Sequence, residues 1–302
     1  MDLKPPLTYD QQIEHLINFH KLKIDDTQKA KEILSIINYY RLSGYGIGLK
    51  EKGSDEFKRG VTLYQLFRLY CFDSRFKNVL MRTVEQIEIS LRAKIAYIIA
   101  NKYGADCLEN KNNFSIPNDK IYKKITDDID FERNRQKHSL PIRHHIEKYN
   151  NRFPIWVTIE LLSFGTLSRL FSILKHEDKR DVAIQYNTDP THLKSWILSL
   201  VEIRNICAHY TRLYNLPLRQ TPKLYSETSK YIKNRNKVFP ILLILKRMLN
   251  ANAQWDSLLK DIKVTIRKYK DVVNLSFLGF PKNWLQILTQ EHNIKNLKSR
   301  QN

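Results

Sequence analysis

The sequence predicts an all-α fold, and three observations support this prediction. Apolar residues recur at spacings of three and four along most of the chain, which is the period of a helix with one buried face. No segment shows a convincing alternation of apolar and polar residues, as a half-buried strand would. The 302 residues include only 8 glycines and contain neither G-x-G-x-x-G nor G-x-x-x-x-G-K-[ST]. A Rossmann or P-loop nucleotide-binding enzyme is therefore set aside.

Helices are expected from the N-terminus onward. Residues 10–19 and 27–40 form two short helices, the second capped by Asp26 or Thr27. Residues 62–101 contain no Gly or Pro, so they form either one long helix or a pair of helices broken near Asp73.

The middle of the chain alternates between polar and apolar stretches. Residues 109–141 are rich in Asn, Lys and Asp and are expected to be an exposed insertion with at most a short helix over 121–129. Pro154 opens a further helix that Gly165 interrupts. Another helix follows over 191–210.

The last third is basic and helical, with helices over 239–250 and 255–272 and a polar tail from Glu291. The expected organisation is a helical bundle core with N-terminal helices and a basic helical C-terminal extension. Its parts are an N-terminal helical segment, 1–58, a core, 59–216, and the extension, 217–302.

The charge favours a polyanionic partner. Lys and Arg exceed Asp and Glu by 20, and the segment from Arg204 onward holds 19 basic and 5 acidic residues. Such a surface suits nucleic acid or an acidic membrane. The alternative is a general preference of the source organism for Lys and Asn.

The cysteines and the apolar runs indicate the compartment. Cys71, Cys107 and Cys207 lie far apart without a C-x-x-C pair, so neither a disulfide framework nor a zinc ribbon is expected. The first ten residues lack the apolar core of a signal peptide, and the longest apolar run, 238–245, is too short to span a bilayer. These features predict a cytoplasmic protein without a membrane span.

One segment carries a spacing typical of a catalytic site, Glu202-Ile-Arg-Asn-Ile-Cys-Ala-His209. Arg followed by His after four to six residues is weak as a bare pattern, because chance alone gives about two matches in this composition. Three pairs occur: Arg133 with His138, Arg169 with His176, and Arg204 with His209. The first lies in the polar insertion and the second in a core stretch. The third, with Asn205 after its Arg, lies on a predicted helix and is preferred.

The geometry of this helix leaves two readings open. Glu202, Asn205 and His209 share one face, whereas Arg204 points about 140° away from His209 around the axis. Arg204 must therefore wrap back, or the helix must distort near Ala208, before both side chains meet one phosphate. The alternative is that the three residues on the shared face form a hydrogen-bonded polar seam between packed helices.

Several stretches resemble the Abi family of bacterial abortive-infection phage-resistance proteins, whose core belongs to the HEPN superfamily of helical ribonuclease-like domains. They cover roughly residues 1 to 220 in order. The matching stretches are Lys4-Pro5 with Gln11-Gln12-Ile13, Asn38 to Tyr45 (NYYRLSGY), Tyr70 to Arg75 (YCFDSR), Val84 to Arg92 (VEQIEISLR), Pro154 to Ser168 (PIWVTIELLSFGTLS) and Val201 to Asn215 (VEIRNICAHYTRLYN).

The resemblance implies a metal-independent endoribonuclease that uses no cofactor. It makes Arg204 and His209 the catalytic pair and Asn205 their polar companion. A histidine can move the protons of the ribose 2′-OH and the leaving 5′-oxygen, while an arginine offers a fork of donors to the phosphate. One His per chain supplies one acid or base, so a homodimer with a composite site is expected.

Other residues are assigned supporting parts. Tyr210, Arg212 and Tyr214 are expected to contact RNA, although the two tyrosines fit a core position at least as well. Glu202 and Glu160 are expected to support the site. Four charged residues at family positions are expected to form buried ion pairs or to support the site: Glu85, Glu88, Arg92 and Glu160.

No metal site is expected. The acidic cluster Asp127, Asp128, Asp130 and Glu132 fits a solvated run better than a cation site. His144-His145 with Glu147 lacks the H-E-x-x-H order of zinc hydrolases.

The preferred function is therefore a HEPN-type ribonuclease in antiphage defence, toxic to its host when active and restrained by a partner, for which the basic C-terminal third suggests an inhibitory small RNA. The rival is a non-catalytic basic helical module that binds RNA or protein. A metal-dependent DNA nuclease finds little support in the sequence.

Overall fold

The computed structural model describes residues 5–249 and 252–290, and all its regular elements over that range are helices. Three isolated β-bridges are the nearest approach to a sheet among those residues. The all-α prediction is confirmed. Lys4 and the polar tail from Glu291 lie outside the described residues. The helices, in chain order, are α1 Tyr9–Asn18, α2 Thr27–Ile36, α3 Tyr39–Ser43, α4 Leu63–Tyr103, α5 Asp119–Arg135, α6 Leu140–Lys148, α7 Ile155–Leu161, α8 Phe164–Ile173, α9 His176–Ile184, α10 Pro190–Ala208, α11 Ser226–Ser229, α12 Phe239–Met248, α13 Asn252–Lys268 and α14 Trp284–Thr289.

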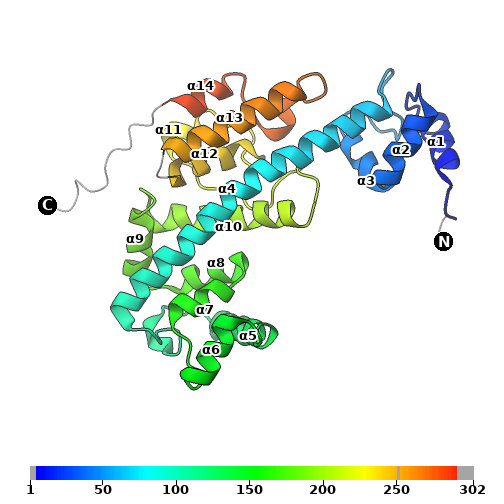
Figure 1. The fold of residues 1–302 in the computed structure, drawn as a ribbon. Coiled ribbons are helices and arrows are strands. Elements are labelled where there is room, and N and C mark those ends of the chain that lie inside the picture. The colour runs from blue at the N-terminus through cyan, green and yellow to red at the C-terminus, as the bar shows by residue number, and fades with distance from the viewer. Residues whose placement is uncertain (1–4, 250–251, 291–302) are drawn as a thin grey trace.

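Helix α4 is the central helix of the molecule. It runs from the N-terminal helices α1–α3 across the whole body, with α12–α14 on one side and α7–α10 on the other (Figure 1). Its 41 residues are continuous, so of the two predicted alternatives the single long helix is confirmed and the pair broken near Asp73 is not. Asp73 is tolerated inside the helix because its carboxylate is buried and receives hydrogen bonds from other segments. Thr62 caps the first turn, since its hydroxyl accepts from the amide of Gln65 at 3.0 Å.

The N-terminal helices pack around a small core of their own. Twelve buried side chains from Ile13 to Leu66 form this cluster, separate from the main core. Asp26 caps α2 by accepting from the amide of Lys29 at 2.9 Å, as the sequence predicts. The second predicted helix ends earlier than expected, at Ile36, and α3 follows as a separate turn capped by Asn38.

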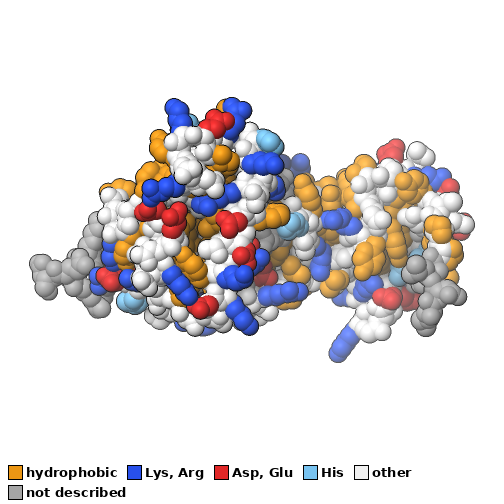
Figure 2. Space-filling view, turned by 90° about the horizontal axis from the view of Figure 1, so that it is seen from below, with side chains coloured by type: hydrophobic (Ala, Val, Ile, Leu, Met, Phe, Trp, Pro, Cys, Tyr) orange, Lys and Arg blue, Asp and Glu red, His pale blue; other side chains and the backbone are white. Residues whose placement is uncertain are grey.

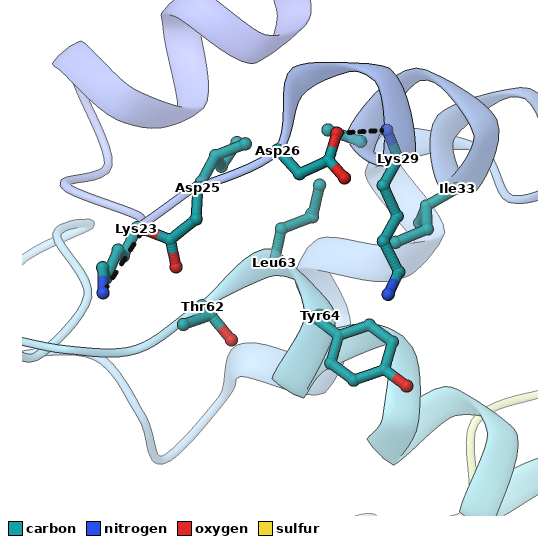
Figure 3. Close-up of a pocket in the computed structure, with 10 residues that line it drawn as sticks. Lys23, Asp25, Asp26, Lys29, Ile33, Thr62, Leu63 and Tyr64 are labelled. Atoms are coloured by element: carbon teal, nitrogen blue, oxygen red, sulfur yellow. Dashed lines mark hydrogen bonds and ion pairs between the residues drawn. The ribbon is translucent and has the colours of Figure 1, made fainter.

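A cavity of about 310 Å³ separates α2 from the start of α4 (Figure 3). Its charged side chains are satisfied locally. Lys23 pairs with Asp25 at 3.3 Å, and the amine of Lys29 lies 4.2 Å from the ring centre of Tyr64. The cavity therefore lies where the N-terminal helices meet α4.

The predicted exposed insertion is more ordered than expected. Helix α5 has 17 residues rather than a short turn and buries Ile125 and Ile129, and α6 follows it. The polar composition misleads here because a helix needs only one narrow apolar stripe to pack. The interruption between α7 and α8 also lies at Leu162–Ser163 rather than at Gly165, because the Ser163 hydroxyl accepts from the amide of Thr166 and caps α8.

The C-terminal third shares the main core. Helix α12 is apolar and buried from Phe239 to Leu245, and its polar residues, Lys246 and Arg247, lie in the last turn. Helix α13 lies along α4, and Arg82 on α4 pairs with Asp261 on α13. The boundary expected at residue 217 therefore does not coincide with a break in the core. None of the helices described here is long and apolar enough to cross a membrane.

Candidate RNA-cleavage site

Helix α10 carries the predicted catalytic residues and is firmly placed. Pro190 occupies its first turn, and the Asp189 carboxylate accepts from the amides of Thr191 and His192. One face of the helix is buried against α4 and α8. The buried side chains are Leu193, Trp196, Ile197, Ser199, Leu200, Ile203, Ile206 and Cys207. The opposite face is left to solvent along Leu198, Asn205 and His209.

Arg204 points from α10 toward a buried carboxylate on α4. Its Nε lies 3.5 Å from Oε2 of Glu88, and Oε1 of the same carboxylate accepts from Arg92 at 2.7 Å. Arg92 also donates to the carbonyls of Ile159 and Leu162 at the end of α7. Two guanidinium groups therefore share one carboxylate, and this three-residue set keeps a net positive charge.

The guanidinium of Arg204 has donors to spare. Its side chain is 30% exposed, and the one hydrogen bond it makes among the described residues is a long contact of 3.4 Å from Nη1 to Oδ1 of Asn205. Its buried Nε forms no hydrogen bond there. A guanidinium that is oriented by Glu88 but unsaturated is suited to receive a phosphate.

His209 stands at the end of α10. The helix ends at Ala208, His209 is its C-cap, and Tyr210 follows with a left-handed φ of 55°. The His209 amide still donates to the carbonyl of Asn205 at 2.9 Å, so the backbone follows the helix up to His209 and the wide angular separation expected from Arg204 remains. The His209 side chain is exposed, and its ring makes no hydrogen bond with any described residue. The imidazole is free to exchange protons with a ligand.

The buried carboxylate of Asp73 anchors the loop that follows His209. This carboxylate, 1% exposed, accepts from the amides of Leu213 and Tyr214, the latter at 2.7 Å, and from the Tyr45 hydroxyl at 2.8 Å. Burial and the neighbouring Asp73 carboxylate raise the pKa of Tyr45 far above its usual range. The hydroxyl therefore stays protonated and donates to the carboxylate.

Two cations complete the support of this loop. Lys77 pairs with Asp73 at 3.1 Å and donates to the carbonyl of Thr211 at 2.9 Å. Arg41 of α3 donates to the carbonyl of Tyr210 at 2.5 Å. The roles of Asp73 and Lys77 were not predicted from the sequence. Their i, i+4 spacing inside an apolar helix was the available signal, as it was for Glu88 and Arg92.

The two glutamates expected to support the site lie elsewhere. Glu202 accepts from the amides of Arg219 at 2.9 Å and Gln220 at 2.6 Å, so it ties the downstream loop to α10. Glu160 is exposed on α7 and lines a groove there. Of the expected buried ion pairs, Glu88 with Arg92 is confirmed. The prediction that Glu85 and Glu160 form buried ion pairs is wrong, because both side chains are exposed on the outer faces of their helices.

The three residues expected to contact RNA are placed differently from one another. Tyr210 is 72% exposed. Arg212 is half-buried, donates to the carbonyl of Tyr214 at 2.8 Å, and burial lowers its pKa. Tyr214 is 2% exposed, and its hydroxyl accepts from the amide of Asn274 at 2.9 Å. The alternative prediction, that these tyrosines belong to the core, holds for Tyr214, whose ring has no face open to a base.

The other two Arg–His pairs differ from Arg204 and His209 in the state of their arginines. Arg169 pairs with Asp128 at 2.6 Å. Arg133 lies 4.4 Å from the ring centre of Phe153 and donates to Thr158. Both arginines hydrogen-bond directly to a neighbouring element, whereas Arg204 approaches Glu88 only to 3.5 Å; the Nε of all three arginines makes no hydrogen bond among the described residues.

The acidic cluster lies on α5 rather than on a loop, and three of its four carboxylates, those of Asp128, Asp130 and Glu132, pair with cations. Asp128 accepts from Lys124, Thr166 and Arg169; burial alone would raise its pKa, but these partners hold it down at about 2. Glu132 pairs with Arg135 at 2.6 Å. Within residues 5–249 and 252–290, no group of three or more His, Cys, Asp or Glu side chains is arranged to hold a metal ion.

Comparison with known proteins gives one match. The model of the family described as Abi-like protein matches residues 32–215, which is more than half of the chain and runs from the second half of α2 through α10 to the loop after His209. No curated protein and no solved structure matches the chain. The extent of the family match shows that this chain belongs to the Abi-like protein family.

Proposed function

We propose that this protein is a metal-independent endoribonuclease of HEPN type that acts in abortive-infection defence against phage, with Arg204, Asn205 and His209 at its site. The observation that carries the proposal is the state of Arg204. It is oriented by the buried Glu88 carboxylate, keeps free donors, and precedes the exposed imidazole of His209 by five residues on the same helix. Family membership supports the biological role.

The reaction follows from these groups. A base removes the proton from the ribose 2′-OH, and the 2′-oxygen forms a bond to phosphorus while the bond to the 5′-oxygen breaks. An acid returns a proton to the 5′-oxygen, leaving a 2′,3′-cyclic phosphate and a 5′-hydroxyl. Arg204 would stabilise the charge on the non-bridging oxygens, and His209 would serve as one of the two proton-transfer groups.

A homodimer would supply the second proton-transfer group. The exposed stripe of α10, which includes Leu198, Asn205 and His209, is open to a second copy of itself. Two-fold pairing of such stripes would bring two imidazoles to one composite site.

The direct test is cleavage of an RNA panel in EDTA by the wild type and by His209→Ala. The wild type is expected to leave cyclic phosphate ends, and the variant is expected to lose at least about 10²-fold in rate. His138→Ala is the matched control, because His138 is exposed and also follows an arginine, Arg133, by five positions. Equal rates for the wild type and His209→Ala would contradict the proposal.

An inhibitory RNA is the proposed restraint. Lys260, Lys263 and Arg267 form an exposed basic stripe on α13 that lines a cavity of about 430 Å³. RNA held there would dissociate steeply as salt rises. We expect nucleic acid to co-purify with the wild type and to decrease in a Lys260→Glu/Lys263→Glu variant. Lys120→Glu/Lys123→Glu on α5, with the same spacing and exposure, is expected to leave it unchanged.

The rival function is a non-catalytic module that binds RNA or protein through the same basic surface. Salt-sensitive RNA binding without any cleavage, in a dimer and after removal of co-purified RNA, would favour it over the nuclease.

A further inference from the structure

A second site lies on the part of the molecule formed by α6 and α7. A pocket of about 810 Å³ opens there, with room for a nucleobase. Its lining is mostly aromatic and cationic: His144, His145, Tyr149, Arg152, Phe153 and Trp156. Arg204 and His209 are not among its lining residues, and nothing in the ribonuclease proposal uses this pocket.

The rings of the pocket are stacked and partly open. His145 stacks on Phe153 with ring centres 5.5 Å apart and on Tyr149 at 5.1 Å. Tyr149 and Trp156 are each 54% exposed, although both are large aromatic side chains. Open aromatic faces beside a pocket are platforms on which the bases of unpaired nucleic acid stack.

Polar groups at the same pocket can read the edge of a base. The Nδ1 of His145 donates to the carbonyl of Pro141 at 3.0 Å, so its Nε2 is left for a ligand. Asp106 and Arg152 pair at 2.7 Å in the lining and bring one acceptor and several donors to it. The Asn150 amide adds a donor and an acceptor.

A groove extends from this pocket along α4, and Arg204, His209 and Arg92 are not among its lining residues. It has a volume of about 650 Å³, follows α4 from Ala93 to Asn101, and shares Ala105 and Trp156 with the pocket. Ala93 directly follows Arg92, which is bridged to Arg204 through Glu88. From Asn101 to Ala93 the groove follows eight residues of helix, about 12 Å, which a few nucleotides span.

We propose that this pocket binds an unpaired nucleobase of a single-stranded RNA whose backbone continues along α4 toward Arg204. The proposal rests on the ribonuclease function for the identity of its ligand. It makes unpaired RNA the preferred substrate class, because a base inside a duplex has no free face to stack.

The overall charge of the chain, +20, favours RNA over a protein helix as the occupant. Close to the pocket, cations and carboxylates are interspersed, as they are over the face that Figure 2 shows: Arg152 pairs with Asp106 at 2.7 Å, and Arg143 with Glu147 at 3.7 Å. Glu160, on the groove, would repel phosphates from the groove floor. The bases would therefore face the groove, and the phosphates would lie along its outer edge.

The test measures binding in full-length His209→Ala protein, which separates binding from cleavage. Labelled single-stranded RNA is titrated against this protein and against versions that also carry Trp156→Ala or Tyr149→Ala. Loss of one stacked base is expected to weaken binding at least about fivefold. Phe19→Ala, which removes a 68% exposed ring from the N-terminal part, is the matched control and is expected to bind normally.

A second measurement, tryptophan fluorescence, does not depend on replacing an aromatic side chain by alanine. Trp156 is the most exposed of the tryptophans, so stacking is expected to quench indole fluorescence in His209→Ala, and Trp156→Phe is expected to keep the affinity but lose most of the quenching. Unchanged affinity in both alanine variants would overturn the pocket assignment. Conversion of a dimer to a monomer by those variants would also overturn it, since the occupant would then be a second copy. Cleavage by the wild type against His209→Ala decides the ribonuclease function separately.

Discussion

The carboxylate of Glu88 on α4 lies 3.5 Å from the guanidinium of Arg204 on α10, while its other oxygen is bound by Arg92. The arginine of the candidate site is therefore oriented by the buried ion pair of Glu88 and Arg92 on the central helix α4.

Replacing Glu88 by Ala is expected to destabilise the fold by about 3 kcal/mol, because it leaves two guanidinium groups with an unpaired buried charge. Urea unfolding measures the loss. Glu85→Ala removes an exposed carboxylate three residues earlier on the same helix and is expected to change stability by less than about 0.5 kcal/mol. Equal effects of the two substitutions would show that Glu88 does not hold the arginines.

Arg204→Lys keeps the positive charge but removes the planar fork of donors. Cleavage is expected to fall by about 10²-fold with little change in unfolding, because a single ammonium cannot contact two phosphate oxygens in the same geometry. Arg219→Lys, at an exposed position in the next loop, is the control. A rate within twofold of the wild type would mean that Arg204 acts only as a charge.

Asp73→Ala is expected to cost about 3 kcal/mol of stability and to lower cleavage as well. The carboxylate holds Leu213 and Tyr214 and pairs with Lys77, so its loss releases the loop next to His209 and leaves a buried cation unpaired. Asp271→Ala removes a carboxylate from an exposed pair with Arg68 and is expected to cost at most about 1 kcal/mol. Retained activity in a folded Asp73→Ala protein would contradict this role of the loop.

Asp128 is expected to make the fold sensitive to acid. Its folded-state pKa, held at about 2 by Lys124, Thr166 and Arg169 against the effect of burial, lies below the usual value of 3.8. The stabilisation is therefore complete above about pH 4 and is lost as the pH falls toward 2, with a size of roughly 1–2 kcal/mol. Asp128→Asn is expected to show a smaller loss of stability than the wild type between pH 5 and pH 3, and Asp127→Asn on the exposed face is expected to behave as the wild type. An unchanged pH profile in Asp128→Asn would mean that these partners do not hold the carboxylate in its charged form.

The reactivity of the three free cysteines tests how tightly the core is packed around them. Burial raises the pKa of Cys107 to about 11 and that of Cys207 to about 12, so both thiols are expected to resist iodoacetamide in native protein at pH 8. Mass spectrometry is expected to find native labelling confined to the partly buried Cys71 and labelling of all three in urea. Rapid native labelling of Cys207 would mean that α10 is not packed on α4 as described.

The sequence alone determined the helical class and most helix positions, because apolar residues at spacings of three and four record which face of each helix is buried. It also marked Arg204, Asn205 and His209 and the Abi-like family. The continuity of α4 through Asp73 could not be read in this way, because a buried carboxylate inside a helix is stable only when other segments donate to it.

Tertiary structure decided which charged residues meet. Glu202 shares a helix face with Asn205 and His209, yet it binds the backbone of the following loop, whereas Glu88, more than a hundred residues away in the chain, orients Arg204. Tyr210 and Tyr214 lie four residues apart, and one is exposed while the other is in the core. Local spacing fixes which residues share a helix face, but the packing of helices distant in sequence fixes what each face meets.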